Sequence, residues 1–416
     1  MLFVATLTRV GANRDSPLRE INVRTDRPRL PRNVWILGFI SMLMDLSSEI
    51  YHSLLPVFIT VTLGLPVAAL GAIDGFAEAT ANFARLVSGR LSDRSLKRKP
   101  WIAAGYGLAA LSKPLFPLAS GAGEILGARF LDRVGKGIRG SPRDALVADE
   151  TPPEIRGHAY GLRQALDTAG ALLAPIAAIV LMWVFADDIR SVFWVAIVPA
   201  FLSLALAWFA LREPILKTPQ NKPSPLFRGF RDIAKPTRRL IAVGFLFTLA
   251  RFSEAFLVLK GMEVGLRPML SPLALVLFNL SYTVLAYPAG GLSDRIAPRT
   301  VLMMGMALLI AADLILAWTA NYVGLSIGIL LWGAHMALTQ GVFARMVADS
   351  APGHLRATSF GAFWFVTGIA TFLASLAAGF IWDRDGSEAT FIAAAGAAAV
   401  ALAMLSLLRE DPRAPA

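Results

Sequence analysis

The sequence contains no cysteine, only four histidines and few charged residues for its length of 416. Without cysteine the chain cannot form a disulfide, a thiolate metal site or a cysteine nucleophile. The histidines do not have the spacing of metal ligands, so we expect no metal site. Charged residues make up 17% of the chain, against about 25% in soluble domains, which is too few to cover a soluble surface.

Apolar residues, in contrast, make up 56% of the chain, and its mean hydropathy is +0.58. A helix that crosses a bilayer needs about 20 apolar residues, and twelve stretches of roughly that length follow one another. They predict an all-α membrane protein in the lipid bilayer, with spans at 34–62, 68–88, 101–119, 124–147, 158–184, 191–211, 239–260, 271–289, 300–318, 323–346, 357–382 and 389–408.

Lysine and arginine are distributed unevenly between the two sides that twelve spans define. Of the forty, twenty-nine fall in the N-terminal tail, the C-terminus and the loops on their side, and four fall in the opposite loops. The positive-inside rule then places both termini in the cytoplasm. The net charge of +11 is therefore a topology signal, and we expect no nucleic-acid partner.

The order of the spans predicts a chain in two halves joined by a linker. The stretch 212–238 is the longest polar segment between spans and is rich in proline and basic residues. The predicted parts are a cytoplasmic tail (1–33), a six-helix bundle (34–211), a cytoplasmic linker (212–238), a second six-helix bundle (239–408) and a cytoplasmic tail (409–416).

Matching motifs recur in the two halves, about 200 residues apart. Gly89-Arg-Leu-Ser-Asp93-Arg94 recurs as Gly290-Gly-Leu-Ser-Asp294-Arg295, and Val147-Ala-Asp149 recurs as Val347-Ala-Asp349. The matches involve glycines and charges, which are less frequent here than apolar residues. They predict an internal duplication, which is a known plan of transporters.

At these motifs the chain resembles the major facilitator superfamily. The segment 89–100 is similar to the loop between the second and third helices of that family, and the charged run 131–149 is similar to the fourth helix of a bacterial subgroup. The resemblance covers about 34–408. It implies a secondary transporter of a small solute in the bacterial inner membrane, and not an enzyme; we expect a monomer.

The resemblance also implies a conformational latch at the cytoplasmic face. Its residues would be Gly89, Asp93, Arg94 and Arg98, with Asp294 and Arg295 in the second half. A cluster of charges that only sets the topology is the alternative.

Direction and coupling rest on the fifth span. Ala174-Pro175 is similar to the Gly-Pro motif of proton-coupled exporters, with alanine where glycine is expected. The resemblance thus implies proton-coupled export. A uniporter or an importer of an organic anion is the alternative within transport, and a non-transporting membrane sensor is the alternative of another class.

Charged side chains at membrane depth are costly and mark candidate sites. Steps of three and four residues place Arg129, Arg133 and Lys136 on one stripe of the fourth span. The positions 200 residues later carry no charge, so the fold does not demand the stripe. Either the stripe binds an anionic part of a substrate, or it forms a fixed network with nearby carboxylates.

Carboxylates in the first, second and fifth spans are the candidates for proton coupling. They are Asp45, Glu49, Asp74, Glu78 and Asp167. A carboxylic acid in a low-dielectric cavity can be protonated near neutral pH, which releases a basic partner and shifts a conformational equilibrium. We expect no cofactor beyond the proton gradient. Candidates for stacking on or hydrogen bonding to a substrate are Trp332, His335 and Gln340, with Trp364.

Overall fold

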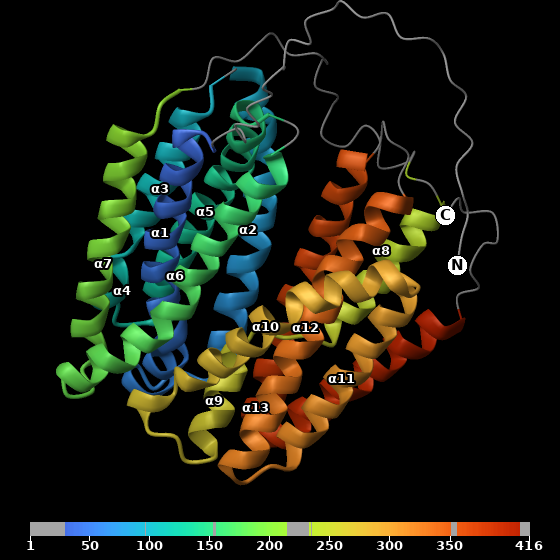
Figure 1. The fold of residues 1–416 in the computed structure, drawn as a ribbon. Coiled ribbons are helices and arrows are strands. Elements are labelled where there is room, and N and C mark those ends of the chain that lie inside the picture. The colour runs from blue at the N-terminus through green and yellow to red at the C-terminus, as the bar shows by residue number, and fades with distance from the viewer. Residues whose placement is uncertain are drawn as a thin grey trace, which may run out of the picture.

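The computed structural model describes residues 30–95, 97–152, 155–213, 233, 235–350 and 356–407. Regular structure in these ranges is helical, as the sequence predicts, with no strand. Figure 1 shows two bundles that touch at one end and diverge toward the end where α1 begins. The tail, most of the predicted linker 212–238 and the segment 409–416 lie outside the described ranges.

The first bundle begins near the start of the described chain. Its helices are α1 (Arg32–Val57), α2 (Val67–Ser95), α3 (Lys99–Ser112), α4 (Leu115–Leu118), α5 (Ala122–Glu150), α6 (Arg156–Val184) and α7 (Ile189–Ala205). Two π-helical turns extend α1 and α7, at Phe58–Thr62 and Leu206–Ala210.

The second bundle repeats this plan with two departures. Its helices are α8 (Lys235–Leu249), α9 (Ala255–Glu263), the 3-10 turn η4 (Pro268–Leu270), α10 (Leu273–Arg295), α11 (Pro298–Trp318), α12 (Tyr322–Ser350) and α13 (Arg356–Leu407). α13 covers two predicted spans, which are separated by a turn at Gly386, and a glycine adopts the φ of 88° found there at little cost.

The other departure corrects the sequence prediction. The span predicted at 239–260 is interrupted at 250–254, between α8 and α9. Ser253 explains how the break is stabilised: its Oγ accepts from the backbone N–H of Ala255, and its own N–H donates to Ser375 Oγ at 3.1 Å. A serine that caps the following apolar helix is a start signal that the span analysis missed.

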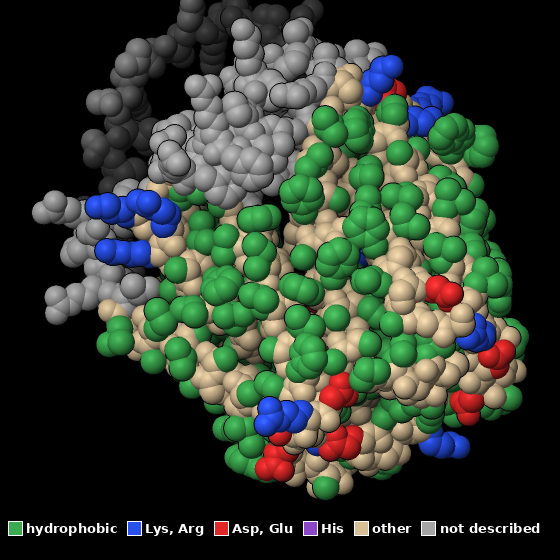
Figure 2. Space-filling model, turned by 180° about the vertical axis from the view of Figure 1, so that it is seen from behind, with side chains coloured by type: hydrophobic (Ala, Val, Ile, Leu, Met, Phe, Trp, Pro, Cys, Tyr) green, Lys and Arg blue, Asp and Glu red, His purple; other side chains and the backbone are tan. Residues whose placement is uncertain are grey.

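Seven helical stretches of the described residues are long and apolar enough to cross a membrane. The remaining spans of the twelve-helix plan fail that test for visible reasons. α2 and α5 carry many charges, α3–α4 and α8–α9 are divided, and α13 counts once although it turns at Gly386. Figure 2 shows apolar side chains across the middle of one face, with charged ones gathered toward its two ends.

The two bundles are joined at the end opposite to the start of α1, which we call the closed end. Gly71 and Gly75 of α2 lie against the backbone of α13, where a Cβ on Gly75 would come within 2.8 Å of the Phe372 Cα. Asp383 of α13 accepts from the first two N–H groups of α2, those of Val67 and Ala68, at 2.8 and 2.7 Å. A carboxylate at a helix N-terminus is a favourable pairing, so Asp383 caps α2 from the other bundle.

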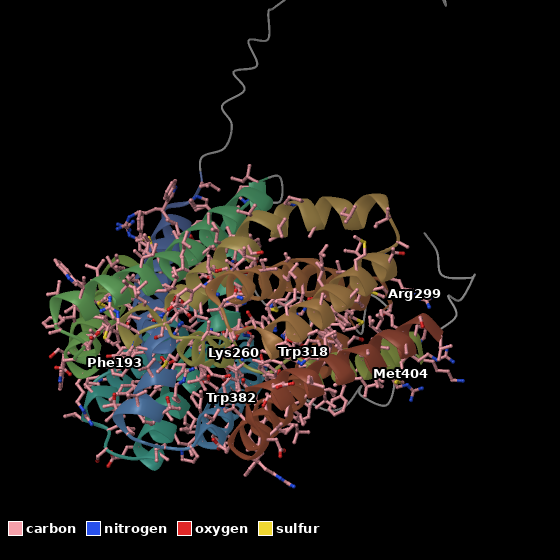
Figure 3. All side chains as sticks on the ribbon, turned by 90° about the horizontal axis from the view of Figure 1, so that it is seen from below. Phe193, Lys260, Arg299, Trp318, Trp382 and Met404 are labelled. Atoms are coloured by element: carbon pink, nitrogen blue, oxygen red, sulfur yellow. The ribbon has the colours of Figure 1, made fainter. Side chains whose placement is uncertain are left out.

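A buried cation braces the second bundle near this end. Lys260 of α9 donates to Glu263 and to Ser387 of α13, both at 3.0 Å. Figure 3 shows Lys260 near the middle of the view from below. The contact fixes α9 against the turn in α13, beside the cap that Asp383 provides.

Candidate transport cavity

A cavity of about 480 Å³ lies between the two bundles. The first bundle lines it with side chains from α1, α2, α5 and α6, and the second with side chains from α8, α10, α12, α13 and the 250–254 break. A volume of this size fits the range of small-molecule sites, about 300–1,000 Å³.

The wall from the first bundle is charged, and two of its cations are held by carboxylates. Arg129 of α5 forms a fully buried ion pair with Asp74 of α2, and its Nη2 lies 3.0 Å from His52 Nδ1. Arg133 pairs with Glu78 at 3.1 Å, and the Glu78 side chain is 43% exposed. For these two arginines the contacts favour the network hypothesis of the charged stripe.

Two other charged side chains of α5, those of Asp132 and Arg139, do not line the cavity. Asp132 accepts from Lys113 at 2.8 Å in a buried pair with no place on the cavity wall. Arg139 lies over the Tyr106 ring, 4.5 Å from its centroid. The glycines on either side of Lys136 also have a packing role: a Cβ on Gly135 would lie 2.6 Å from the Gly105 carbonyl oxygen.

Lys136 and Arg85 remain available on this wall. Both line the cavity, and within the described part of the chain neither has a carboxylate within 4.0 Å. Glu49 also lines the cavity without an ion-pair partner among these residues. The stripe therefore combines held cations with an available one, Lys136.

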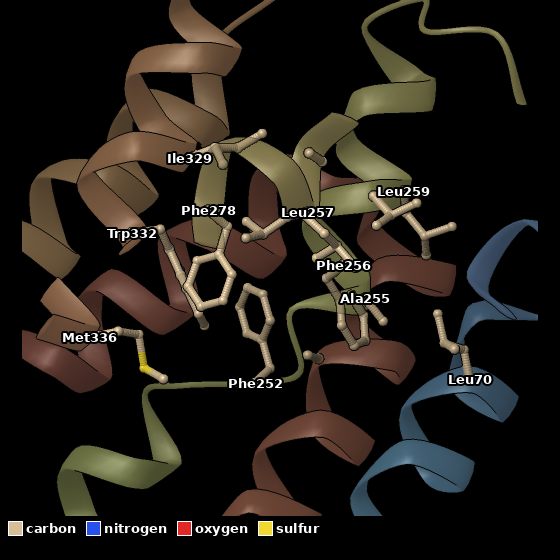
Figure 4. Packing of buried hydrophobic residues seen from close by; sticks show 14 of the residues in the cluster. Leu70, Phe252, Ala255, Phe256, Leu257, Leu259, Phe278, Ile329, Trp332 and Met336 are labelled. Atoms are coloured by element: carbon tan, nitrogen blue, oxygen red, sulfur yellow. The ribbon is translucent and has the colours of Figure 1, made fainter. Parts of the chain in front are cut away.

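The wall from the second bundle combines six aromatic side chains with small polar ones such as threonine and serine. Ring contacts connect Phe247 to Phe343 at 5.5 Å, Phe343 to Phe363 at 5.7 Å and Phe363 to Trp364 at 5.2 Å, between centroids. Figure 4 shows Phe252, from the helix break, facing Phe278 and Trp332. Arg251 and Glu254, also in or beside the break, are the charged residues that this bundle contributes to the lining.

The break also joins the two walls. Ser253 Oγ donates to Asp74 Oδ2 at 2.9 Å, while Asp74 Oδ1 accepts from Arg129. The carboxylate thus has one partner in each bundle. The sequence marks Asp74 as a candidate but gives no sign that Ser253 is its partner.

Several predicted site residues do not reach the cavity. Trp332 and His335 are fully buried behind the wall, and the Trp332 Nε1 donates to Asp313 at 3.2 Å, so neither lines the cavity. Asp45 and Asp167 face each other across α1 and α6, outside the lining. Gln340 does line the cavity and accepts from the Tyr282 hydroxyl.

The predicted latch is described in part. The Arg98 side chain bonds to Asp149 of α5 at 3.1 Å and to Ser92 of α2, so it braces the first bundle internally. A Cβ on Gly89 would lie 3.1 Å from Ser141 Cβ, so glycine permits close packing of α2 on α5. The side chains of Asp93, Arg94, Asp294 and Arg295 lie outside the described part of the structure.

The sequence matches the profile of the Major Facilitator Superfamily over residues 37–278 and 257–416. An uncharacterised MFS-type transporter of Methanocaldococcus jannaschii is 32% identical over 378 residues, which cover 89% of this chain and 93% of that protein. The chain belongs to the Major Facilitator Superfamily. It is therefore a multi-pass membrane protein with the transporter fold of that family.

Two further similarities are more limited. The multidrug resistance protein MdtH of Photorhabdus laumondii is 26% identical over 204 residues, 49% of each chain. The crystal structure of a bacterial homologue of the human lysosomal transporter Spinster, inward-facing and unoccupied, superposes with a TM-score of 0.74 at 15% identity. That superposition covers 91% of this chain and 97% of the other, and it supports the fold alone.

Proposed function

We propose that this protein is a proton-coupled exporter that moves a small organic solute across the bacterial inner membrane by alternating access. One observation carries the proposal: the cavity lies between the bundles, and contacts between the bundles close it at one end. If those contacts open as the other ends approach, the cavity changes the side to which it is accessible. With the predicted topology, this conformation faces the cytoplasm.

Asp74 is the residue that would connect the cavity to the closed end. Its carboxylate receives bonds from Arg129 in the first bundle and from Ser253 in the second. A proton on Asp74 would weaken both charge-assisted bonds and favour separation of the bundles. Glu78 and Glu49, which line the cavity, are the more accessible places for a proton to arrive.

Export has two supports of different kinds. The fifth span carries a degraded form of the motif of proton-coupled exporters, and a relative that matches half of the chain is named a multidrug resistance protein. Import of an organic anion or uniport is the other candidate within transport, because cations outnumber carboxylates among the lining residues.

The absence of cysteine provides a test that needs no known substrate. Asn82→Cys places the chain's single thiol on the cavity wall, and a charged thiol reagent is added to right-side-out or inverted membrane vesicles. We expect rapid labelling from the cytoplasmic side and slower labelling from the other side. Phe83→Cys is the matched control. Its side chain is exposed on the outside of a predicted span and does not line the cavity, so lipid should cover the thiol and it should react poorly from both sides.

The coupling is tested by repeating this labelling at about pH 5.5 and 8. Rates are divided by those of an exposed thiol, Ser406→Cys, to remove the intrinsic pH dependence of the reagent. We expect pH to change the ratio of labelling from the two sides, and Glu49→Gln or Glu78→Gln to reduce that change. A ratio that responds to pH equally in both variants would refute the assignment of proton coupling to these residues and favour uniport or pH sensing elsewhere.

A further inference from the structure

The charges on the cavity wall do not balance. Among the residues that the structure describes, five cationic and four carboxylate side chains line the cavity. Two of the cations are held in the Arg129–Asp74 and Arg133–Glu78 pairs. In the described ranges, three cations on the wall then have no carboxylate within 4.0 Å: Arg85, Lys136 and Arg251. Two carboxylates, Glu49 and Glu254, have no lysine or arginine within that distance. One negative charge on a bound molecule would neutralise the lining.

The unpaired charges are also separated along the cavity. α2 and α5 both run from the closed end to the open end, and Arg85 and Lys136 come later in them than Asp74, Glu78, Arg129 and Arg133. At 1.5 Å per residue, Arg85 lies about 16 Å beyond Asp74 along its helix. Glu49 and Glu254 lie near the level of Asp74, toward the closed end. The part of the cavity from Lys136, at the middle of α5, to the open end, which we call the mouth, is therefore cationic on the side of the first bundle.

The opposite side of the mouth is aromatic. Phe343, Phe363 and Trp364 lie within about two turns of the open ends of α12 and α13, and Trp364 is 42% exposed. Among the described residues, the apolar side chains that the first bundle contributes to the lining are Ala81 and Ala171, and none has an aromatic carbon ring. A ligand that uses both walls must carry its charge on one side and a planar apolar body on the other.

We propose that the cavity binds an aromatic monoanion, with its acidic group against Lys136 and Arg85 and its ring against Phe343, Phe363 and Trp364. This inference rests on the proposed transport function and names the class of its substrate. A carboxylate gains charge-assisted bonds from the unpaired cations, and the ring gains apolar and stacking contact with the aromatic row.

The first experiment uses calorimetric titration of the purified full-length protein with matched naphthalene compounds. The probes are 1-naphthoate, neutral 1-naphthamide, the 1-naphthylmethylammonium cation, and acetate, which lacks the ring. We expect 1-naphthoate to bind at least tenfold more tightly than any of the others. Equal or tighter binding of the amide or the cation would overturn the proposal, as would failure of 1-naphthoate to bind.

Variants then assign the two contacts. Lys136→Gln should remove most of the preference for 1-naphthoate over 1-naphthamide, while Lys136→Arg keeps it. Trp364→Leu should weaken the binding of both 1-naphthoate and 1-naphthamide. Arg384→Gln removes an exposed cation far from the cavity and should change nothing. A preference that survives in Lys136→Gln would place the anion site elsewhere and overturn the assignment.

A second experiment measures the charge preference without a ligand. Asn82→Cys is treated with the negatively charged sulfonatoethyl methanethiosulfonate or the positively charged trimethylammonium-ethyl reagent, and both rates are divided by those at Ser406→Cys. We expect several-fold faster reaction of the anionic reagent, reduced by Lys136→Gln. Equal normalised rates would contradict a cationic mouth.

The two proposals fail in different ways. If Asn82→Cys is labelled from both sides but binding ignores charge, the substrate class is wrong and transport stands. If Asn82→Cys is never labelled from the closed side, the transport mechanism is wrong, whatever the protein binds.

Discussion

The two bundles solve the same packing problem with different chemistry. In the first, Lys113 at the end of α3 pairs with Asp132 of α5 at 2.8 Å. In the second, the positions 200 residues later hold Asp313 of α11 and Trp332 of α12, which are joined by a hydrogen bond of 3.2 Å. α5 and α12 have equal length and the same offset, Ala122–Glu150 and Tyr322–Ser350.

This difference extends to the cavity. Lys136 and Met336 occupy matched positions and both line it, as an available cation and an apolar side chain. The matched helices thus occupy equivalent places, while the side chains that they present to the cavity differ. The charged wall and the aromatic wall are properties of the individual bundles, and the fold requires neither.

The largest expected effect on stability comes from breaking the buried Lys113–Asp132 ion pair of the first bundle. Lys113→Met leaves Asp132 charged and unpartnered, which we expect to cost about 3–5 kcal/mol of unfolding free energy. Unfolding by SDS titration measures it. The double variant Lys113→Met/Asp132→Leu is the control and should recover most of the loss; no recovery would mean that packing, not charge, dominates this site.

The matched change in the second bundle should cost less. Trp332→Phe keeps an aromatic ring but removes the N–H that Asp313 accepts, leaving a buried polar group at a cost of about 1–3 kcal/mol. The same titration compares the two bundles directly. A loss of unfolding free energy as large as that of Lys113→Met would show that the ion pair of the first bundle and the hydrogen bond of the second are energetically alike.

The closed end offers a smaller and more specific effect. Asp383→Ala removes the cap that α13 supplies to α2, which is worth about 1 kcal/mol. The equilibrium should therefore shift about fivefold toward the conformation in which the closed end has opened. Spin labels at Thr62→Cys and Arg384→Cys would report a longer distance in a larger fraction of molecules. Asp385→Ala, two residues away, is the control; equal shifts in both variants would argue against the cap.

The smallest effect on stability is expected at Lys136. This cation has no carboxylate partner in the described ranges, so Lys136→Gln should change the unfolding free energy by less than about 0.5 kcal/mol. Arg129→Gln, which strands Asp74, should be far more costly. Comparable losses would mean that Lys136 belongs to the structural network after all.

Sequence patterns predicted the helices better than the contacts between them. Apolar length predicted most helix ends to within a few residues, although α2 and α10 continue past the predicted ends at 88 and 289 to Ser95 and Arg295. The glycine between the last two predicted spans lies at the turn in α13. The break at 250–254 was missed because Arg251, Ser253 and Glu254 lie between two apolar runs that together have the length of one span. Its stabilising partners, Ser375 and Asp74, are distant in sequence.

The predicted site residues and the cavity lining differ where helix rotation matters. On α12, Met336 lines the cavity while His335 lies against Phe247 and Trp332, because one residue turns the helix by about 100°. The positions of Arg129, Arg133 and Lys136 on one stripe were predictable, but their partners depend on which helices face α5. Charge counting alone therefore could not separate held cations from available ones.

The most direct test of alternating access measures both ends of the molecule together. Two spin-label pairs are used, each introduced into the cysteine-free chain. Thr62→Cys with Arg384→Cys reports on the closed end, and Lys97→Cys with Ser406→Cys reports on the open end. Distances are compared by pulsed electron resonance at about pH 5.5 and 8. Alternating access predicts that the closed-end distance lengthens and the open-end distance shortens in the same fraction of molecules. A closed-end distance that stays single and short while the open end moves would contradict it.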